Sequence, residues 1–272
     1  FYFARHEPFE LHWTDPPPPA VPANLYEATV ISAADITPHM RRIIVSVDDA
    51  RPFVGGDMHV RLIVPPKGRT PVWPVIGDDG RLVWPSGDDA LLVRAYTIRA
   101  VEAERNELTI DFLQHPMPGI ATPGADFARD ARPGDRVALM GPGSGEVPKA
   151  DTILLIGDET ALPAIARIAA EVPAGTRLSA IIEVENADEE QPLPSRGECA
   201  VRWLHRAGYP AGAKAVLADA ATDAIARAET GTFIWAACEK ADIRVIRRFL
   251  KDRGHDRRNM YVAWYWARGV SG

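Results

Sequence analysis

The chain has 272 residues, of which 46% are apolar and 25% charged, a composition typical of a globular protein with room for two domains. Its formal net charge of −6 argues against nucleic acid as the main partner, because phosphate binding needs a basic face. No apolar run approaches the roughly 18 residues that a membrane-spanning helix needs, so no membrane span is expected.

Cysteine and histidine usage limits the chemistry further. Cys199 and Cys238 are too few for a disulfide framework and fit a reducing compartment, which predicts a cytoplasmic location. The seven histidines form no HExxH motif and no Cys/His pair at metal-ligand spacing. We therefore expect no protein-bound metal.

The first half of the chain is dominated by strand signals. Residues 1–23 contain PPPP at 16–19 and predict an extended N-terminal arm. From 24 to 143 apolar residues recur with period two, and turn signals such as VGGD, DDGR and RPGD separate the strands predicted at 41–47, 58–65, 107–113 and 135–140. Roughly six short strands predict a small antiparallel barrel with no helix of useful length.

The pattern changes after residues 142–151. TILLIG at 152–157 is wholly apolar, as expected for a strand buried on both faces, and a helix capped by Asp158 or Thr160 is predicted over 158–172. Later strands at 179–185, 232–238 and 261–267 alternate with helices at 214–229 and 241–254, which predicts a parallel sheet covered by helices. GPGSG at 141–145 reads as a linker, because no GK[ST] follows it.

One segment carries more polar chemistry than a strand requires. In RAYTIR, residues 94–99, Arg94 and Arg99 are permanent cations suited to phosphate, Tyr96 offers a flat ring and Thr97 a hydroxyl. These groups suit a ligand with both a phosphate and a planar ring, such as a flavin nucleotide. Strict alternation separates Arg94 and Tyr96 from Thr97 and Arg99, so shared contact needs a bend or a ligand lying across the strand end. A half-exposed strand with solvated arginines is the alternative.

The identity and order of six segments indicate a family resemblance. They are ITPHMRRI (36–43), RAYTIR (94–99), ARPGD (131–135), GDETALPAIARI (157–168), FIWAACE (233–239) and YVAWYWARG (261–269). Over about residues 24–269 the chain thereby resembles the siderophore-interacting proteins, which are FAD-dependent ferric-siderophore reductases of the ferredoxin-reductase-like superfamily. The resemblance implies a six-stranded antiparallel Greek-key β-barrel that binds FAD (24–143), followed by an α/β domain with a parallel sheet that binds NADPH or NADH (150–272). It also implies NAD(P)H-dependent reduction of chelated Fe(III) to Fe(II), with release of iron from the siderophore.

The resemblance further implies the FAD contacts in the barrel. Thr97 would lie near the reactive edge of the flavin, and no acid or base is required because the reaction is mediated by the flavin. The implied contacts are Arg94, Ala95, Tyr96, Thr97, Arg99, Asp111, Leu113, His115, Gly119, Ala121, Thr122, Gly124 and Ala125. The phosphate loop departs from the family pattern HGxxGPAxxWA, with Pro116 for a glycine, Phe127 for the tryptophan and about three inserted residues. Arg94 and Arg99 would therefore carry more of the diphosphate than usual.

In the second domain, the resemblance places Asp158, Thr160 and Ala161 in the nicotinamide cleft, with acidic capping of a helix as the alternative. Cys238 and Glu239 end a strand where open α/β sheets place ligands, and Cys238 either faces the flavin or packs in the core.

The closing strand is rich in aromatic residues. Trp264, Tyr265 and Trp266 would cover the flavin or its adenine, or else form an edge strand folded onto the barrel. Glu183 and Glu185 read mainly as a solvated strand end.

The expected substrate is a ferric siderophore, often an anion, so a basic rim would help to capture it. Lys67, Arg69, Lys240 and Arg244 are the candidates, unless they are simply solvated charges. Two other functions remain open: a general NAD(P)H:flavin or diaphorase-type reductase, and a non-catalytic siderophore-binding protein. The expected state is a monomer.

Overall fold

The structure is a computed structural model that describes residues 20–114, 122–214 and 216–269. In chain order its elements are β1 (Leu25–Thr37), β2 (Met40–Val47), η1 (Arg51–Phe53), β3 (His59–Val64), β4 (Val75–Ile76), β5 (Leu82–Val83), η2 (Gly87–Asp89), β6 (Leu92–Glu102), η3 (Ala103–Arg105), β7 (Glu107–Leu113), α1 (Pro123–Asp130), β8 (Arg136–Met140), β9 (Thr152–Asp158), α2 (Leu162–Glu171), β10 (Arg177–Val184), η4 (Ala187–Glu189), β11 (Glu198–His205), α3 (Val216–Arg227), β12 (Phe233–Glu239), α4 (Lys240–Asp252), η5 (Arg257–Asn259) and β13 (Met260–Trp266). None of the helices in the described residues is long and apolar enough to cross a membrane.

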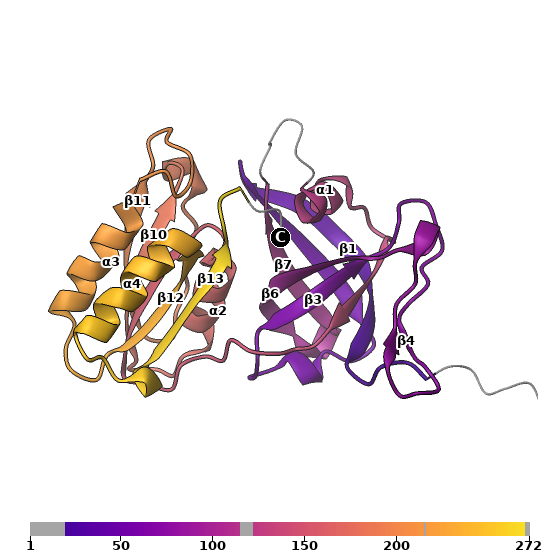
Figure 1. Cartoon of the computed structure of the whole chain (residues 1–272), viewed down its shortest axis with the longest axis horizontal. Coiled ribbons are helices and arrows are strands. Elements are labelled where there is room, and N and C mark those ends of the chain that lie inside the picture. Colours follow the sequence, from indigo (N-terminus) through magenta and orange to yellow (C-terminus); the bar gives the residue numbers. More distant parts are fainter. Residues whose placement is uncertain (1–19, 115–121, 215, 270–272) are drawn as a thin grey trace, which may run out of the picture.

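The first half forms a closed antiparallel barrel in the strand order β1–β2–β7–β6–β3–β8 (Figure 1), which confirms the predicted six-stranded barrel. Alternate residues of these strands point inward and build one apolar core that includes Val45, Val60, Ile98 and Ile110. The helix α1 covers one end of the barrel, and its Ala128 belongs to the same core.

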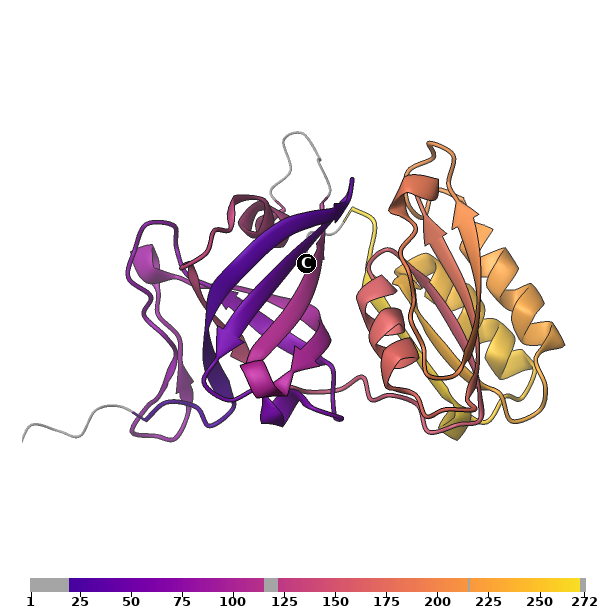
Figure 2. The same ribbon diagram turned by 180° about the vertical axis from the view of Figure 1, so that it is seen from behind.

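The second half forms a five-stranded parallel sheet in the order β11–β10–β9–β12–β13, as the alternation of strands and helices predicts. The central strand β9 is buried from Ile153 to Asp158, which explains its wholly apolar run. The helix α2 lies between the sheet and the barrel, whereas α3 and α4 cover the other face (Figures 1 and 2).

Several local predictions were wrong or incomplete. The helix α1 lies within the region expected to hold none, and the edge strand β11 was not predicted. The helix predicted from residue 158 begins at Leu162, and its N-cap is Ala161 without a side-chain cap bond. Most of the predicted N-terminal arm, residues 1–19, lies outside the described residues.

Candidate functional site

The inner face of β6 carries Arg94 and Tyr96 side by side at the end of the barrel that α1 covers. Each stands opposite a core residue of β3, Leu62 and Val60 respectively. The Arg94 guanidinium donates only to the Val93 carbonyl, at 2.8 Å, and has no acidic partner among the described residues. Burial raises the pKa of Tyr96 to about 12, although the Arg94 charge acts in the opposite direction. Within the part of the chain that the structure describes, Arg94 is therefore a cation without an acidic partner, and it lies beside a neutral phenol.

The head of α1 is packed directly against Tyr96. A Cβ placed on Gly124 would lie 1.9 Å from the Tyr96 hydroxyl, so only glycine allows this approach. The Tyr96 ring also packs against Phe112, with a centroid distance of 4.3 Å. Thr122 is the N-cap of α1, and Gly124 and Ala125 are buried in its first turn. The first turn of α1, with its free N–H groups, is therefore held next to the Arg94–Tyr96 face.

The second arginine of RAYTIR has different surroundings. The strand β6 has an irregularity between Ile98 and Ala100, so Arg99 stands at a bulge. Its Nε lies 3.0 Å from Asp111 but lacks the alignment of a hydrogen bond, whereas Arg42 binds both Asp111 oxygens, at 2.7 and 2.8 Å. Desolvation lowers the pKa of Arg99, and the hydrogen bond to Asp111 raises that of Arg42. Two cations share one buried carboxylate, which leaves one positive charge in excess.

Thr97 points away from Arg94 and Tyr96, as strict alternation predicts. It is 6% exposed and stands opposite His59 on the outer side of the barrel. His59 Nε2 and the Tyr265 hydroxyl of β13 share a hydrogen bond of 2.7 Å. Thr97 therefore lies on the side of the barrel that faces the second domain. Of the other predicted contacts in the barrel, Ala95 is exposed and Leu113 is half-buried opposite Met40.

A cleft of about 870 Å³ adjoins the Arg94–Tyr96 face. Its walls include Leu92, two residues before Arg94, and Phe127 of α1, which packs against Phe112. Lys67 and Arg69 line the same cleft and form ion pairs with Asp130 and Asp89. Its volume and its mixed apolar and polar walls are typical of a small-molecule site.

The carboxyl edge of the parallel sheet holds a second group of predicted residues. Asp158 accepts hydrogen bonds from the Thr160 N–H, at 2.9 Å, and from the Trp266 indole, at 2.7 Å. Gly157 has no room for a side chain, since a Cβ would lie 2.6 Å from that of Ala161. The turn from Gly157 to Ala161 is therefore tightly held at the place where open α/β sheets bind ligands.

Acidic side chains are concentrated at this edge. Burial raises the pKa of Asp158 to about 6 and that of Glu183 to about 7. Glu183 is 3% exposed, so its interpretation as part of a solvated strand end was wrong. It is buried because β10 is an interior strand, and its nearest cation, Arg206, is bound mainly by Glu159, at 2.7 Å. Sequence reasoning assigned Arg206 no role, because it follows the strand β11 that was not predicted.

The remaining predicted residues of this edge differ in exposure. Cys238 is fully buried in the core on the α3–α4 side of the sheet, and burial raises its thiol pKa. Glu239 caps α4 by accepting from the Ala241 N–H. Trp264 is 51% exposed with Lys240 over its ring, whereas Tyr265 turns toward His59 of the barrel.

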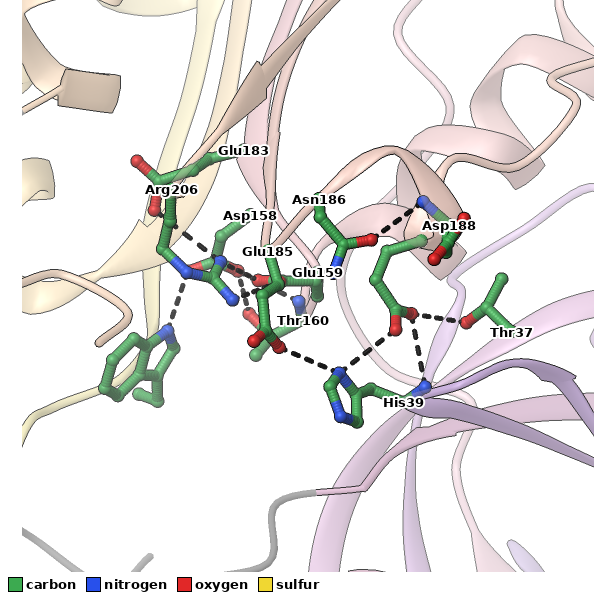
Figure 3. A network of polar contacts seen from close by, with 12 residues as sticks. Thr37, His39, Asp158, Glu159, Thr160, Glu183, Glu185, Asn186, Asp188 and Arg206 are labelled. Atoms are coloured by element: carbon green, nitrogen blue, oxygen red, sulfur yellow. Dashed lines mark hydrogen bonds and ion pairs between the residues drawn. The ribbon is translucent and has the colours of Figure 1, made fainter. Parts of the chain in front are cut away.

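Polar contacts also join the two domains near the β1–β2 turn (Figure 3). His39 Nδ1 lies 2.9 Å from Glu185 and 3.0 Å from the buried Glu189, whose other oxygen accepts from Thr37. These residues lie about 150 positions apart in the chain, and no local pattern indicates their contact.

Some predicted residues are not brought together. Lys67 and Arg69 lie in the barrel domain, between β3 and β4, whereas Lys240 and Arg244 lie on α4 of the second domain. Figure 1 shows β4 and α4 on opposite sides of the molecule. His115, Gly119 and Ala121 lie outside the described residues.

The residues of the barrel fit a flavin dinucleotide. A guanidinium at Arg94 without an acidic partner among the described residues, the closely packed head of α1 and the adjoining cleft together suit a diphosphate that carries a nucleoside.

A barrel followed by a parallel α/β sheet with these features defines the ferredoxin-reductase-like class. A ferredoxin NADP+ reductase from Neisseria gonorrhoeae has the same fold, with a TM-score of 0.60 at 14% identity over 90% of this chain and 100% of that chain.

The chain belongs to the siderophore-interacting protein family. Residues 29–146 match the siderophore-interacting FAD-binding domain, and residues 150–269 match the siderophore-interacting protein model. A siderophore utilization protein from T. fusca is 35% identical, with a TM-score of 0.76 over 91% of this chain and 94% of that chain. The ferric vibriobactin reductase ViuB of Vibrio cholerae is 28% identical over 215 residues, which cover 78% of this chain and 77% of the relative. The barrel is thus a FAD-binding domain, and the chain is a siderophore-related flavin oxidoreductase.

Proposed function

We propose that the protein is an NAD(P)H-dependent ferric-siderophore reductase, with FAD on the barrel (24–143) and the nicotinamide dinucleotide on the α/β domain (150–272). The observation that carries the proposal is the packing of the head of α1 against Tyr96, next to an Arg94 that has no acidic partner among the described residues, on a barrel of this family. The relative named ferric vibriobactin reductase supports the substrate class.

In this proposal Arg94 and the N–H groups of the first turn of α1 hold the FAD diphosphate, with Tyr96 filling the space beneath it. The cleft beside Leu92 and Phe127 takes the adenosine half. Thr97 presents its hydroxyl toward the second domain, where the flavin ring must lie to meet a nicotinamide. Lys67 and Arg69 then serve the adenosine end of the site rather than siderophore capture.

The nicotinamide ring would approach at the turn from Gly157 to Ala161. A cavity of about 140 Å³ at the ends of β10 and β11 is lined by Glu183, Arg206, Tyr209 and Lys214 and would take the adenosine end of this dinucleotide. When bound, FAD would accept a hydride from NAD(P)H and release its two electrons singly, reducing two Fe(III) to Fe(II) with loss of one proton. Oxygen chelators hold the softer Fe(II) less tightly, so iron is released.

Anaerobic stopped-flow measurements of flavin absorbance test this function against its alternatives. We expect NADH or NADPH to reduce the bound FAD, and ferric siderophores to reoxidise it faster than a simple dye does. Faster reoxidation by the dye would identify a diaphorase-type reductase. Reduction by neither nicotinamide would leave a binding protein without turnover. A monomer in the cytoplasm remains our prediction.

A further inference from the structure

Arg167 of α2 is buried at the interface between the barrel and the parallel sheet. Its side chain is 1% exposed, and all of its nitrogens donate hydrogen bonds. Nε donates to Glu171 at 2.8 Å, Nη1 to the Ile98 carbonyl at 3.0 Å and Nη2 to the Phe53 carbonyl at 2.7 Å. Two of the three acceptors belong to the barrel, so one guanidinium links α2 to two barrel segments.

Both acceptors on the barrel side are backbone carbonyls. One belongs to β6, the strand that carries RAYTIR, and the other belongs to η1. Ile98 directly follows Thr97 and stands at the bulge of β6. Phe53 ends η1 and is fully buried in the barrel core. A planar guanidinium reaches two carbonyls at once, which a lysine ammonium on a flexible stem does less well.

On the other side, Arg167 is fixed to the turn at the carboxyl edge of the sheet. It lies five residues after Leu162, the first residue of α2, or about 8 Å along the helix axis at 1.5 Å per residue. The barrel residue Met58 is fully buried in the same apolar cluster as Ile165 and Ile168 of this helix. The helix α2 therefore connects the barrel to the turn from Gly157 to Ala161 through buried contacts.

We propose that Arg167 is a positioning residue that sets the distance between Thr97 and the turn from Gly157 to Ala161, and through them between the two cofactor rings. The inference rests on the proposed function, because that function places the rings. Hydride transfer requires reacting atoms about 3–3.5 Å apart, and a misplacement of about 1 Å can cost about 100-fold in rate.

The test compares Arg167→Met, which keeps the apolar stem but removes the guanidinium, with Arg167→Lys and with Glu171→Gln. The last variant is the matched control, because it changes the Arg167 acceptor within α2 and leaves both barrel carbonyls bonded. The first readout needs no cofactor: calorimetric unfolding and small-angle X-ray scattering of the apoprotein. We expect one transition in the wild type and Glu171→Gln, and separate transitions or a larger radius of gyration in Arg167→Met.

The second readout uses the FAD-loaded protein. We expect the limiting rate of flavin reduction by NADH or NADPH to fall about 10- to 100-fold in Arg167→Met and to recover in part in Arg167→Lys. The FAD dissociation constant should change by less than about threefold, since the barrel contacts remain. A fall in the limiting rate of flavin reduction without a matching change in the FAD dissociation constant distinguishes a positioning role from a role in stabilising the fold.

Three results would overturn the inference. One is that Arg167→Met and Arg167→Lys both keep the wild-type limiting rate of flavin reduction and the wild-type radius of gyration. Another is a fall in rate that follows a matching loss of FAD affinity, which would mean that Arg167 only supports the barrel. The third is a loss equally large in Glu171→Gln. If Arg167→Met does not fold, Arg167→Lys decides by the same criteria. If the wild type binds no FAD, the proposed function fails, while the readouts of the apoprotein still decide whether Arg167 couples the domains.

Discussion

At the scale of single residues, the two arginines of RAYTIR have different environments although the sequence treats them alike. Arg99 shares Asp111 with Arg42, whereas Arg94 has no acidic partner among the described residues. The difference arises from β2 and β7, which bring Arg42 and Asp111 into register. A contact between separate strands of this kind cannot be read from a six-residue motif.

Arg94→Ala should weaken FAD binding about 10- to 100-fold, the effect of losing one charge-assisted hydrogen bond. Arg94→Lys should lose less, because it keeps the charge but not the planar fork. Titration of the apoprotein with FAD measures both. Arg105→Ala, at an exposed arginine on the same barrel, is the control. Equal affinities for Arg94→Ala and the control would exclude Arg94 from the diphosphate site.

Glu183 predicts a pH dependence of stability. Its pKa rises from 4.5 to about 7 on folding, chiefly through desolvation, so the folded state binds more protons than the unfolded state between these values. Stability should therefore decrease as the pH rises through this interval.

Glu183→Gln should remove part of this decrease. As the pH rises from about 5 to about 8, we expect the free energy of unfolding of the variant to increase by about 1 kcal/mol relative to that of the wild type, after allowance for solvent screening. Urea unfolding across this range measures the gain, and Glu198→Gln, at an exposed glutamate of β11, is the control. A constant difference between variant and wild type would refute the assignment.

At the scale of elements, regular periodicity was predictable and short or edge elements were not. The apolar run of β9 and the alternation in β2 and β7 led directly to the sheet and the barrel. The helix α1 has eight residues that include Pro123 and Gly124, so it has too little periodicity to be recognised and depends on packing over the barrel end. The edge strand β11 alternates exposed Glu198 and Arg202 with half-buried Val201 and Trp203, a period-two pattern that the sequence interpretation overlooked.

The docking of α1 provides a test at this scale. Gly124→Ala should displace Tyr96, destabilise the protein by about 1–3 kcal/mol and weaken FAD binding. Tyr96→Phe removes the hydroxyl that the new methyl group would meet, so the double variant should regain part of both losses. A double-mutant cycle with urea unfolding and FAD titration measures the coupling. Purely additive effects would show that the two residues do not meet.

At the scale of the whole molecule, the barrel and the parallel sheet are joined by contacts from several segments. Arg167 binds two barrel carbonyls, His59 binds Tyr265, and His39 lies between Glu185 and Glu189. These contacts place α2 against β6, Tyr265 of β13 against β3, and the segment after β10 against the β1–β2 turn. The order of the motifs predicted two domains, but the contacts that fix their arrangement join residues far apart in the chain.

The most direct test of the account is anaerobic reoxidation of the reduced flavoprotein by ferric siderophores. The protein is loaded with FAD, reduced with one equivalent of NADH or NADPH and mixed in a stopped-flow instrument with ferric siderophore and a ferrous chelator. We predict that oxidised flavin returns at a rate that increases with siderophore concentration, and that two Fe(II) appear for each reduced flavin. Flavin that stays reduced in the presence of ferric siderophores, or that reoxidises without Fe(II), would contradict the account.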